Sequence, residues 1–307
     1  MTKKERAIAA IEGRPVDHIP SGFWLHFPES CFYGDAAVQA HLDFFRETGT
    51  DIQKIMNENL VPCDIPIRKA GDWKNLRPFN RQSPFIVNQV DMIKRILDRT
   101  GGEGLTLATI HGIVASAWHA RGGSAGYETG SGLLAEHLRE NPSAVSYGWE
   151  IISDGLEILT QACLEAGADG IYYAALGGES YLFTDEEFEA YIKPHDLKIL
   201  KAAEKSCYNV LHICKDRLNL KRYQGCLLYT SENPADSAQF GKPFRSRHWK
   251  LGQKFHHRCH RICSNLRRRG VGGPARSLYK NPAGFFCCLK ANAAFGAITS
   301  AGGANFF

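Results

Sequence analysis

The chain has 307 residues, 44% of them hydrophobic, with 37 Lys and Arg against 32 Asp and Glu. This composition suits a globular domain with a large core, and no apolar run approaches the roughly 20 residues that a membrane span needs. The charge is distributed unevenly, because residues 1–236 hold all 32 acids and 24 bases, whereas residues 237–307 hold 13 bases and no acid. We therefore predict one domain over residues 1–236 and an atypical basic tail over residues 237–307.

The N-terminus predicts an amphipathic helix. Ile8 and Ile11 fall on its inward side, and Gly13 and Pro15 end the pattern. The segment has no long apolar core, so no targeting segment is predicted. The cysteines of residues 1–236 are few and irregularly spaced, which favours a reducing, cytoplasmic location over a disulfide framework.

Short apolar segments then alternate with helical patterns. In chain order the first elements are a strand at 18–24, a helix at 36–49, a strand at 51–56, a long loop with several prolines, and a helix at 90–101. A strand at 106–112, a helix at 141–167 with an Asn cap, a strand at 169–176, a helix at 185–206 interrupted at Pro194, and a strand at 209–214 follow.

Repeated strand–helix units predict an α/β fold with a parallel sheet and right-handed crossovers. We favour a (β/α)8 TIM-type barrel whose C-terminal strands are missing or altered, with a doubly wound open sheet as the alternative. No GxGxxG phosphate loop follows the first strand, which argues against a dinucleotide-binding fold.

The fifth strand carries the strongest site candidates. His212 and Cys214 are two residues apart, so a strand would project both from one face. Two soft donors in one cavity are part of a zinc site, and we predict them as metal ligands. The alternative is a buried cysteine beside a histidine that is hydrogen-bonded to the backbone.

Five further residues lie where the second, third and fourth strands end, at the mouth where catalytic groups of barrels collect. We predict Glu179, His111 and Glu58 as catalytic groups and Tyr181 and Asn57 as cofactor-binding groups. Glu179 is about as well explained as a solvated loop acid, and the others as satisfied core or loop residues.

The basic tail admits three interpretations. It could be an arm that binds nucleic acid or a small zinc module, but it has no Cys-x-x-Cys pair. We favour the third interpretation, an out-of-frame or non-native sequence, because 71 residues without an acid are rich in Arg, Cys and His.

Four segments together resemble the uroporphyrinogen decarboxylase superfamily: ERAIAAIEGRPVDHIP (5–20), EAGADGIYYAALGGES (165–180), LFTDEEFEAYIKPHDLKIL (182–200) and LHICKDRLNL (211–220). The resemblance covers about residues 3–223. It implies a barrel that is either a tetrapyrrole decarboxylase or a zinc-dependent, corrinoid-linked methyltransferase.

The loop after the first strand distinguishes these branches. The decarboxylase is expected to have arginines there for a substrate with many carboxylates, but FWLHFPES (23–30) has none. The remaining cations that could reach the mouth and bind such carboxylates lie in the long second loop: Arg68, Lys69, Arg77 and Arg81.

The methyltransferase branch is expected to carry a His-x-Cys pair after the fifth strand and a later cysteine. His212 and Cys214 match the pair, and Cys287 or Cys288 is the candidate for the third ligand. Zinc bound there would hold an incoming thiol deprotonated near neutral pH.

The sequence therefore predicts a methyltransferase-like enzyme that uses zinc, takes a small-molecule substrate and receives the methyl group from a corrinoid on a partner protein. The alternatives are uroporphyrinogen decarboxylation without a cofactor and an inactive fragment of such an enzyme. We expect no nucleic-acid or membrane partner, and the sequence does not predict the oligomeric state.

Overall fold

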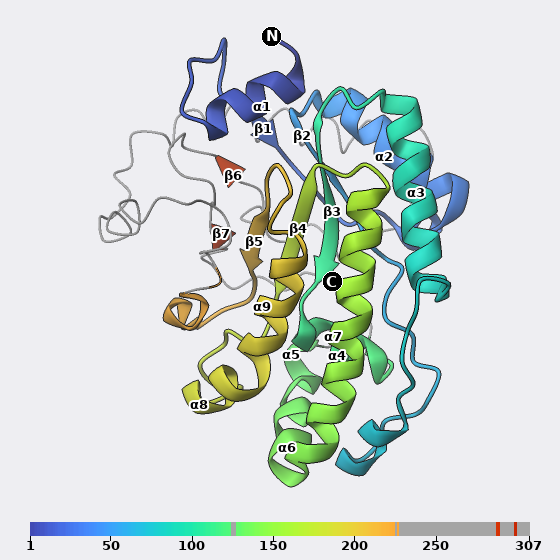
Figure 1. Ribbon diagram of the computed structural model, residues 1–307, viewed down its shortest axis with the longest axis vertical. Helices are drawn as coiled ribbons and strands as arrows, with labels where there is room; N and C mark the ends of the chain where they lie inside the picture. The colour runs from blue at the N-terminus through green and yellow to red at the C-terminus, as the bar shows by residue number, and fades with distance from the viewer. Residues whose placement is uncertain (124–126, 225, 227–286, 289–297, 300–307) are drawn as a thin grey trace.

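The computed structural model describes residues 1–123 and 127–224, Cys226, and two short strands at 287–288 and 298–299 (Figure 1). Most of the predicted basic tail therefore lies outside the described residues. Over the part of the chain that is described, no helix combines the length and apolar character needed to cross a membrane.

Five parallel strands form the centre of the sheet in sequential order: β1 (Ser21–Gly22), β2 (Ile52–Ile55), β3 (Leu105–His111), β4 (Gly170–Ala175) and β5 (Val210–Ile213). They curl into a half-barrel. Two short strands flank them, with β6 (Cys287–Cys288) antiparallel to β1 and β7 (Ile298–Thr299) parallel to β5. Because the parallel strands follow one another in sequence, the sheet has no point at which the strand order reverses. This favours the barrel type of winding over the doubly wound sheet.

Most of the longer helices fall where the sequence predicts them. Their bounds are α1 (Lys3–Ile11), α2 (Gly34–Thr48), α3 (Pro84–Thr100), α4 (Ile113–Ala120), α5 (Tyr127–Gly130), α6 (Gly132–Glu140), α7 (Pro142–Glu165), α8 (Asp185–Glu187) and α9 (Lys193–Ala202). Short 3-10 turns lie at η1 (Glu29–Cys31), η2 (Ala70–Asn75) and η4 (Leu220–Tyr223), and η3 (Phe188–Ile192) is a π-turn.

Two helix predictions are wrong in detail. α3 begins at Pro84, six residues before the predicted start, because proline fits the first helical turn where no amide donor is needed. The interruption expected at Pro194 is the π-turn η3 just before it, after which α9 continues with proline in its first turn. The helices α4 to α6 were not predicted from the sequence.

The helices α2, α3, α7 and α9 cover the outer face of the sheet (Figure 1). Successive side chains of β4 point to opposite faces of the sheet. Tyr173 points outward, and its hydroxyl donates to Asp196 of α9 at 2.5 Å, whereas Tyr172 points into the lumen. This confirms that one of the two tyrosines lines the barrel and the other packs under a helix.

The helix α1 closes the lumen at the amino ends of the strands. Ala7 is fully buried against Ile52, Leu105 and Tyr172, while Ile8 and Ile11 are only half-buried. The prediction that Ile8 and Ile11 face inward is thus correct in direction.

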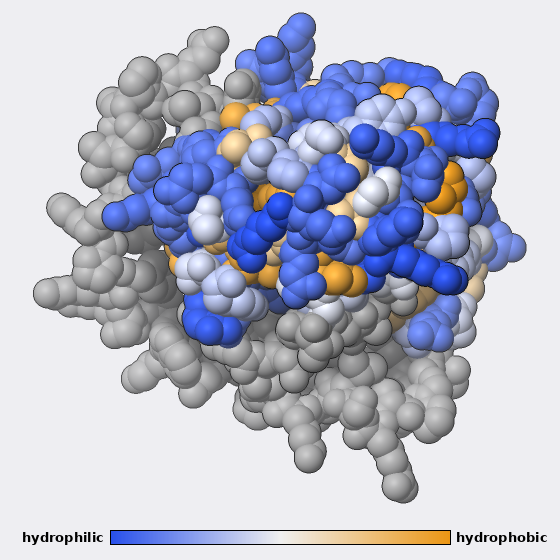
Figure 2. All heavy atoms as spheres, turned by 90° about the horizontal axis from the view of Figure 1, so that it is seen from below, coloured by the Kyte–Doolittle hydropathy of each residue, from blue (hydrophilic) through white to orange (hydrophobic). Residues whose placement is uncertain are grey.

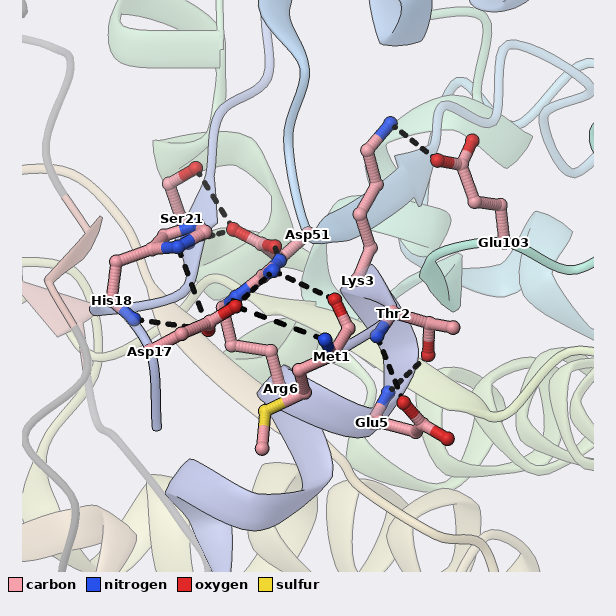
Figure 3. A network of polar contacts seen from close by, with 10 residues as sticks. All are labelled: Met1, Thr2, Lys3, Glu5, Arg6, Asp17, His18, Ser21, Asp51 and Glu103. Atoms are coloured by element: carbon pink, nitrogen blue, oxygen red, sulfur yellow. Dashed lines mark hydrogen bonds and ion pairs between the residues drawn. The ribbon is translucent and has the colours of Figure 1, made fainter. Parts of the chain in front are cut away.

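A buried guanidinium fastens α1 to the sheet (Figure 3). Arg6 donates to Asp17 and to Asp51, each at 2.5 Å, and Asp51 in turn accepts the amide of Ser21 at 2.8 Å. These contacts join the helix to the segments that begin β1 and β2, so the closed end of the lumen is fixed by charge as well as by packing.

Candidate functional site

The carboxyl ends of the strands bring polar side chains together on the inner face. The register aligns His111 of β3 with Ala174 of β4, and Ala174 with His212 of β5. Cys214 lies one residue beyond β5, and its amide donates to the carbonyl of Ala175 at 3.3 Å, which continues the pairing. His212 and Cys214 therefore share the inner face of one extended segment.

His212 is held as a neutral imidazole. Its ring stacks on that of Tyr172, with centroids 5.4 Å apart and planes at 28°. Burial, with the nearby charges of Lys54 and Lys215, lowers the pKa of His212 to about 4. Its buried Nδ1 has no hydrogen-bond partner among the described residues. A buried imidazole nitrogen without a partner is an available donor for a metal or ligand.

Sequence reasoning missed Lys54, the inward-facing lysine of β2. Its side chain is buried, and Nζ lies 3.1 Å from the sulfur of Met56, 4.3 Å from the centroid of the Tyr172 ring and 5.8 Å from that of Trp24. No ion pair joins Lys54 to a carboxylate within the described residues. Alternation along residues 51–56 could have identified it, because every second side chain of a barrel strand faces the lumen.

The contacts of Lys54 do not offset the burial of a charge. Cation–π contacts stabilise an ammonium by about 0.5–2 kcal/mol, whereas removing one from water costs several kcal/mol. Burial accordingly lowers the pKa of Lys54 to about 7, although the charges of Glu58 and Cys214 act in the opposite direction. An amine of this kind is a mixture of neutral and protonated forms at neutral pH.

Glu58 and His111 lie at the same mouth. Glu58 contacts Nδ1 of His26 at 3.0 Å. Burial acts to raise the pKa of Glu58, but the hydrogen bond with His26 and the charges of His26, His111 and Lys54 outweigh burial and hold that pKa below its ordinary value. His111 contacts the carbonyl of Asn57 at 2.9 Å through Nε2, and burial lowers its pKa.

Asn57 has a structural explanation. Its amide nitrogen donates to the carbonyl of Thr109 at 3.2 Å, and its amide oxygen accepts the backbone amide of Asn59 at 3.0 Å. The first bond joins the segment after β2 to β3, and the second holds the loop that follows β2. This favours the alternative of a satisfied core residue over a role in cofactor binding.

Glu179 and Tyr181 follow β4 but point to different surroundings. Glu179 is fully buried and accepts the amide of Gly177 at 2.8 Å, so the alternative of a solvated loop acid is wrong. Burial raises its pKa against these backbone hydrogen bonds, and its nearest polar neighbours include Tyr127 and Lys215. Tyr181 is exposed, with the guanidinium of Arg217 3.9 Å from the centroid of its ring.

Arg81 of the second loop is not available at the mouth. It pairs with Glu165 at 2.7 Å, and Glu165 is the last residue of α7, immediately before the amino end of β4. That places Arg81 at the opposite end of the strands. Arg68, Lys69 and Arg77 are exposed along the same loop. Arg81 therefore does not contribute to a cluster of arginines at the mouth, which a carboxylate-rich substrate would need.

Two surface cavities lie near these elements. A cavity of about 220 Å³ is lined by Glu58 and His119 together with Tyr33, Leu60, Val61, Pro62, Gly122 and Gly123. A larger one of about 420 Å³ lies between α2 and α3, where Asn88, Asp91 and Arg95 line it. We assign the site by its chemistry to the strand ends, because the larger cavity holds no group from β3, β4 or β5. Seen from the carboxyl ends, the described surface is mainly hydrophilic with small separate apolar areas (Figure 2).

Metal ligands among the described residues are few. They contain no group of three or more His, Cys, Asp and Glu side chains that could hold an ion. The pair His212 and Cys214 fits zinc by donor type, since one is a neutral imidazole and the other a thiol. Cys287 and Cys288 form β6, which pairs with β1 at the other end of the sheet order from β5.

The chain matches known proteins in structure but not in sequence. No protein-family model matches the chain, and no curated protein matches its sequence. Among solved structures, a methyltransferase from Methanosarcina mazei superposes with a TM-score of 0.56 at 19% identity, over 73% of this chain and 72% of that one. The likeness is one of fold.

Proposed function

We propose that the chain is a methyltransferase-like enzyme in which His212 and Cys214 bind a zinc ion that activates a thiol acceptor. The observation that carries the proposal is the half-buried, neutral His212, whose Nδ1 has no partner among the described residues, two residues before Cys214 at the carboxyl end of β5. The fold shared with a protein described as a methyltransferase supports it. The methyl group would come from a corrinoid on a partner protein.

Each residue of the proposed site would have a separate role. Zinc, when bound, would hold an acceptor thiol in its deprotonated, nucleophilic form. Stacking on Tyr172 fixes the plane of the His212 ring, so Nδ1 keeps one direction. Cys214 supplies the thiolate ligand. Glu58 and His111 border the same mouth and would orient the acceptor, and the third ligand would come from outside the described residues.

Metal binding tests the proposal without an activity assay. The full chain, stripped with a chelator, is titrated with Co²⁺, and a thiolate-to-cobalt absorption band is followed in the near ultraviolet. We expect the band for the unaltered chain. His212→Ala should weaken binding by more than about 100-fold, because it removes a ligand rather than its support. Cys214→Ser should remove the band.

The matched control is Cys63→Ser, since Cys63 is an exposed cysteine of the second loop. This variant should bind Co²⁺ like the unaltered chain. Equal binding by Cys214→Ser would contradict the proposal. Decarboxylation of a uroporphyrinogen by the metal-free chain would also refute it and support the cofactor-free alternative.

A further inference from the structure

Lys54 is a buried amine that the proposed zinc chemistry does not use. It sits on the inner face of β2, inside the half-barrel. We propose that Lys54 is a covalent binding site for a small carbonyl compound, whose aldehyde or ketone carbon condenses with Nζ to form an imine.

The groups around Nζ leave its lone pair usable. Its closest neighbours are the Met56 sulfur and the rings of Tyr172 and Trp24. None of these compensates a full positive charge as a carboxylate would. The charges that favour protonation come from Glu58 and Cys214, but burial dominates and lowers the pKa to about 7. A substantial share of Nζ is therefore unprotonated at neutral pH, as attack on a carbonyl requires.

The position of Lys54 suits a ligand that enters from the strand ends. Lys54 pairs with Leu107, whereas His212 pairs through Ala174 with His111, four residues further along β3. Lys54 thus lies deeper in the lumen than His212. The Tyr172 ring connects the two residues, because it contacts Nζ of Lys54 and also stacks on the ring of His212.

The aromatic pair also suits the shape of the product. The rings of Trp24 and Tyr172 lie 4.8 Å apart at 64°, so they present two apolar surfaces around Nζ. A planar C=N group with a small substituent packs against such surfaces.

The chemical step balances without a redox partner. The lone pair of Nζ attacks the carbonyl carbon, and the carbonyl oxygen takes up a proton to give a carbinolamine. Loss of one water molecule then leaves the C=N bond. The reaction is reversible, so reduction of the imine by added hydride is needed to retain the adduct for detection.

Reductive trapping tests this proposal. The full chain is treated at pH 7 with limiting acetaldehyde and cyanoborohydride, and ethylated lysines are located by peptide mass spectrometry over time. At pH 7 the unprotonated fraction of an amine with a pKa of about 7 exceeds that of an ordinary lysine by on the order of 10³. Burial also restricts access to Nζ, so the advantage should be smaller than this ratio, but Lys54 should still label faster than the exposed Lys94.

Two controls make the result specific. In urea the preference should vanish, because it depends on burial, and Lys54 and Lys94 should label alike. Cys63→Ser, which alters an exposed cysteine of the second loop, should leave labelling of Lys54 unchanged. Labelling of Lys54 no faster than that of Lys94 in the folded chain overturns the proposal, and so does a preference that persists in urea.

Discussion

Asp196 should make the folded chain less stable at alkaline than at acidic pH. Its carboxyl is buried under the sheet, accepts the hydroxyl of Tyr173 at 2.5 Å, and has an Oδ2 without a partner among the described residues. Burial raises its pKa to about 7, although the hydrogen bonds from Tyr173 and the amide of Ile113 act to lower it. We predict that Asp196→Asn removes this pH dependence.

The magnitude follows from the two pKa values. The folded state binds the proton more tightly than the unfolded chain, so stability falls as pH rises from about 4 to about 7 and is then constant. The loss of stability is about 4 kcal/mol at pH 8 and roughly 1.5 kcal/mol at pH 5. Asp196→Asn should therefore gain about 3 kcal/mol relative to the unaltered chain between pH 5 and pH 8.

Urea unfolding at pH 5, 6.5 and 8 measures this difference, provided that the m-values of the two proteins agree. Asp154→Asn is the matched control, because Asp154 is an exposed acid that pairs with Lys198 at the surface. Its effect should stay within about 1 kcal/mol at each pH. A difference between Asp196→Asn and the unaltered chain that is the same at pH 5 and pH 8 would refute the reasoning.

Three further substitutions test other parts of the fold. Lys54→Met should stabilise the chain by up to about 5 kcal/mol below pH 7, because the pKa of Lys54 is lower in the folded state than in the unfolded chain. This gain should shrink toward pH 10, and thermal unfolding across the range measures the stability of both proteins. Arg6→Met should cost about 3–5 kcal/mol by leaving Asp51 buried and unpaired, and denaturant unfolding should show that adding Asp51→Asn recovers much of the loss. Gly170→Ala should prevent normal folding, since a Cβ there would lie 1.6 Å from a backbone oxygen, whereas Gly71→Ala meets nothing within 4 Å and should leave the circular dichroism spectrum unchanged.

The fold was predictable where the signal is local. Strand and helix periods located β2 to β5 and the long α7, because apolar spacing and the Asn141 cap are written in adjacent residues. The region 113–140 was not predicted, since the apolar segment after Gly112 contains no breaker that would separate a strand from α4. How the sheet continues beyond β5 depends on residues that the structure mostly does not describe. The sequence prediction of an out-of-frame tail stays a prediction.

The candidate site was predictable to the same degree. His212 and Cys214 could be placed on one face because parity along a strand is a property of the chain itself. Burial is not such a property. Glu179 lies fully buried because Arg222 donates to the carbonyls of Gly177 and Glu179 and draws the loop inward, a contact across more than forty residues of sequence. Lys54 acquires its unusual pKa in the same way, because segments distant in the sequence bury it. The residues whose chemistry departs most from the ordinary are therefore those that a single sequence identifies least well.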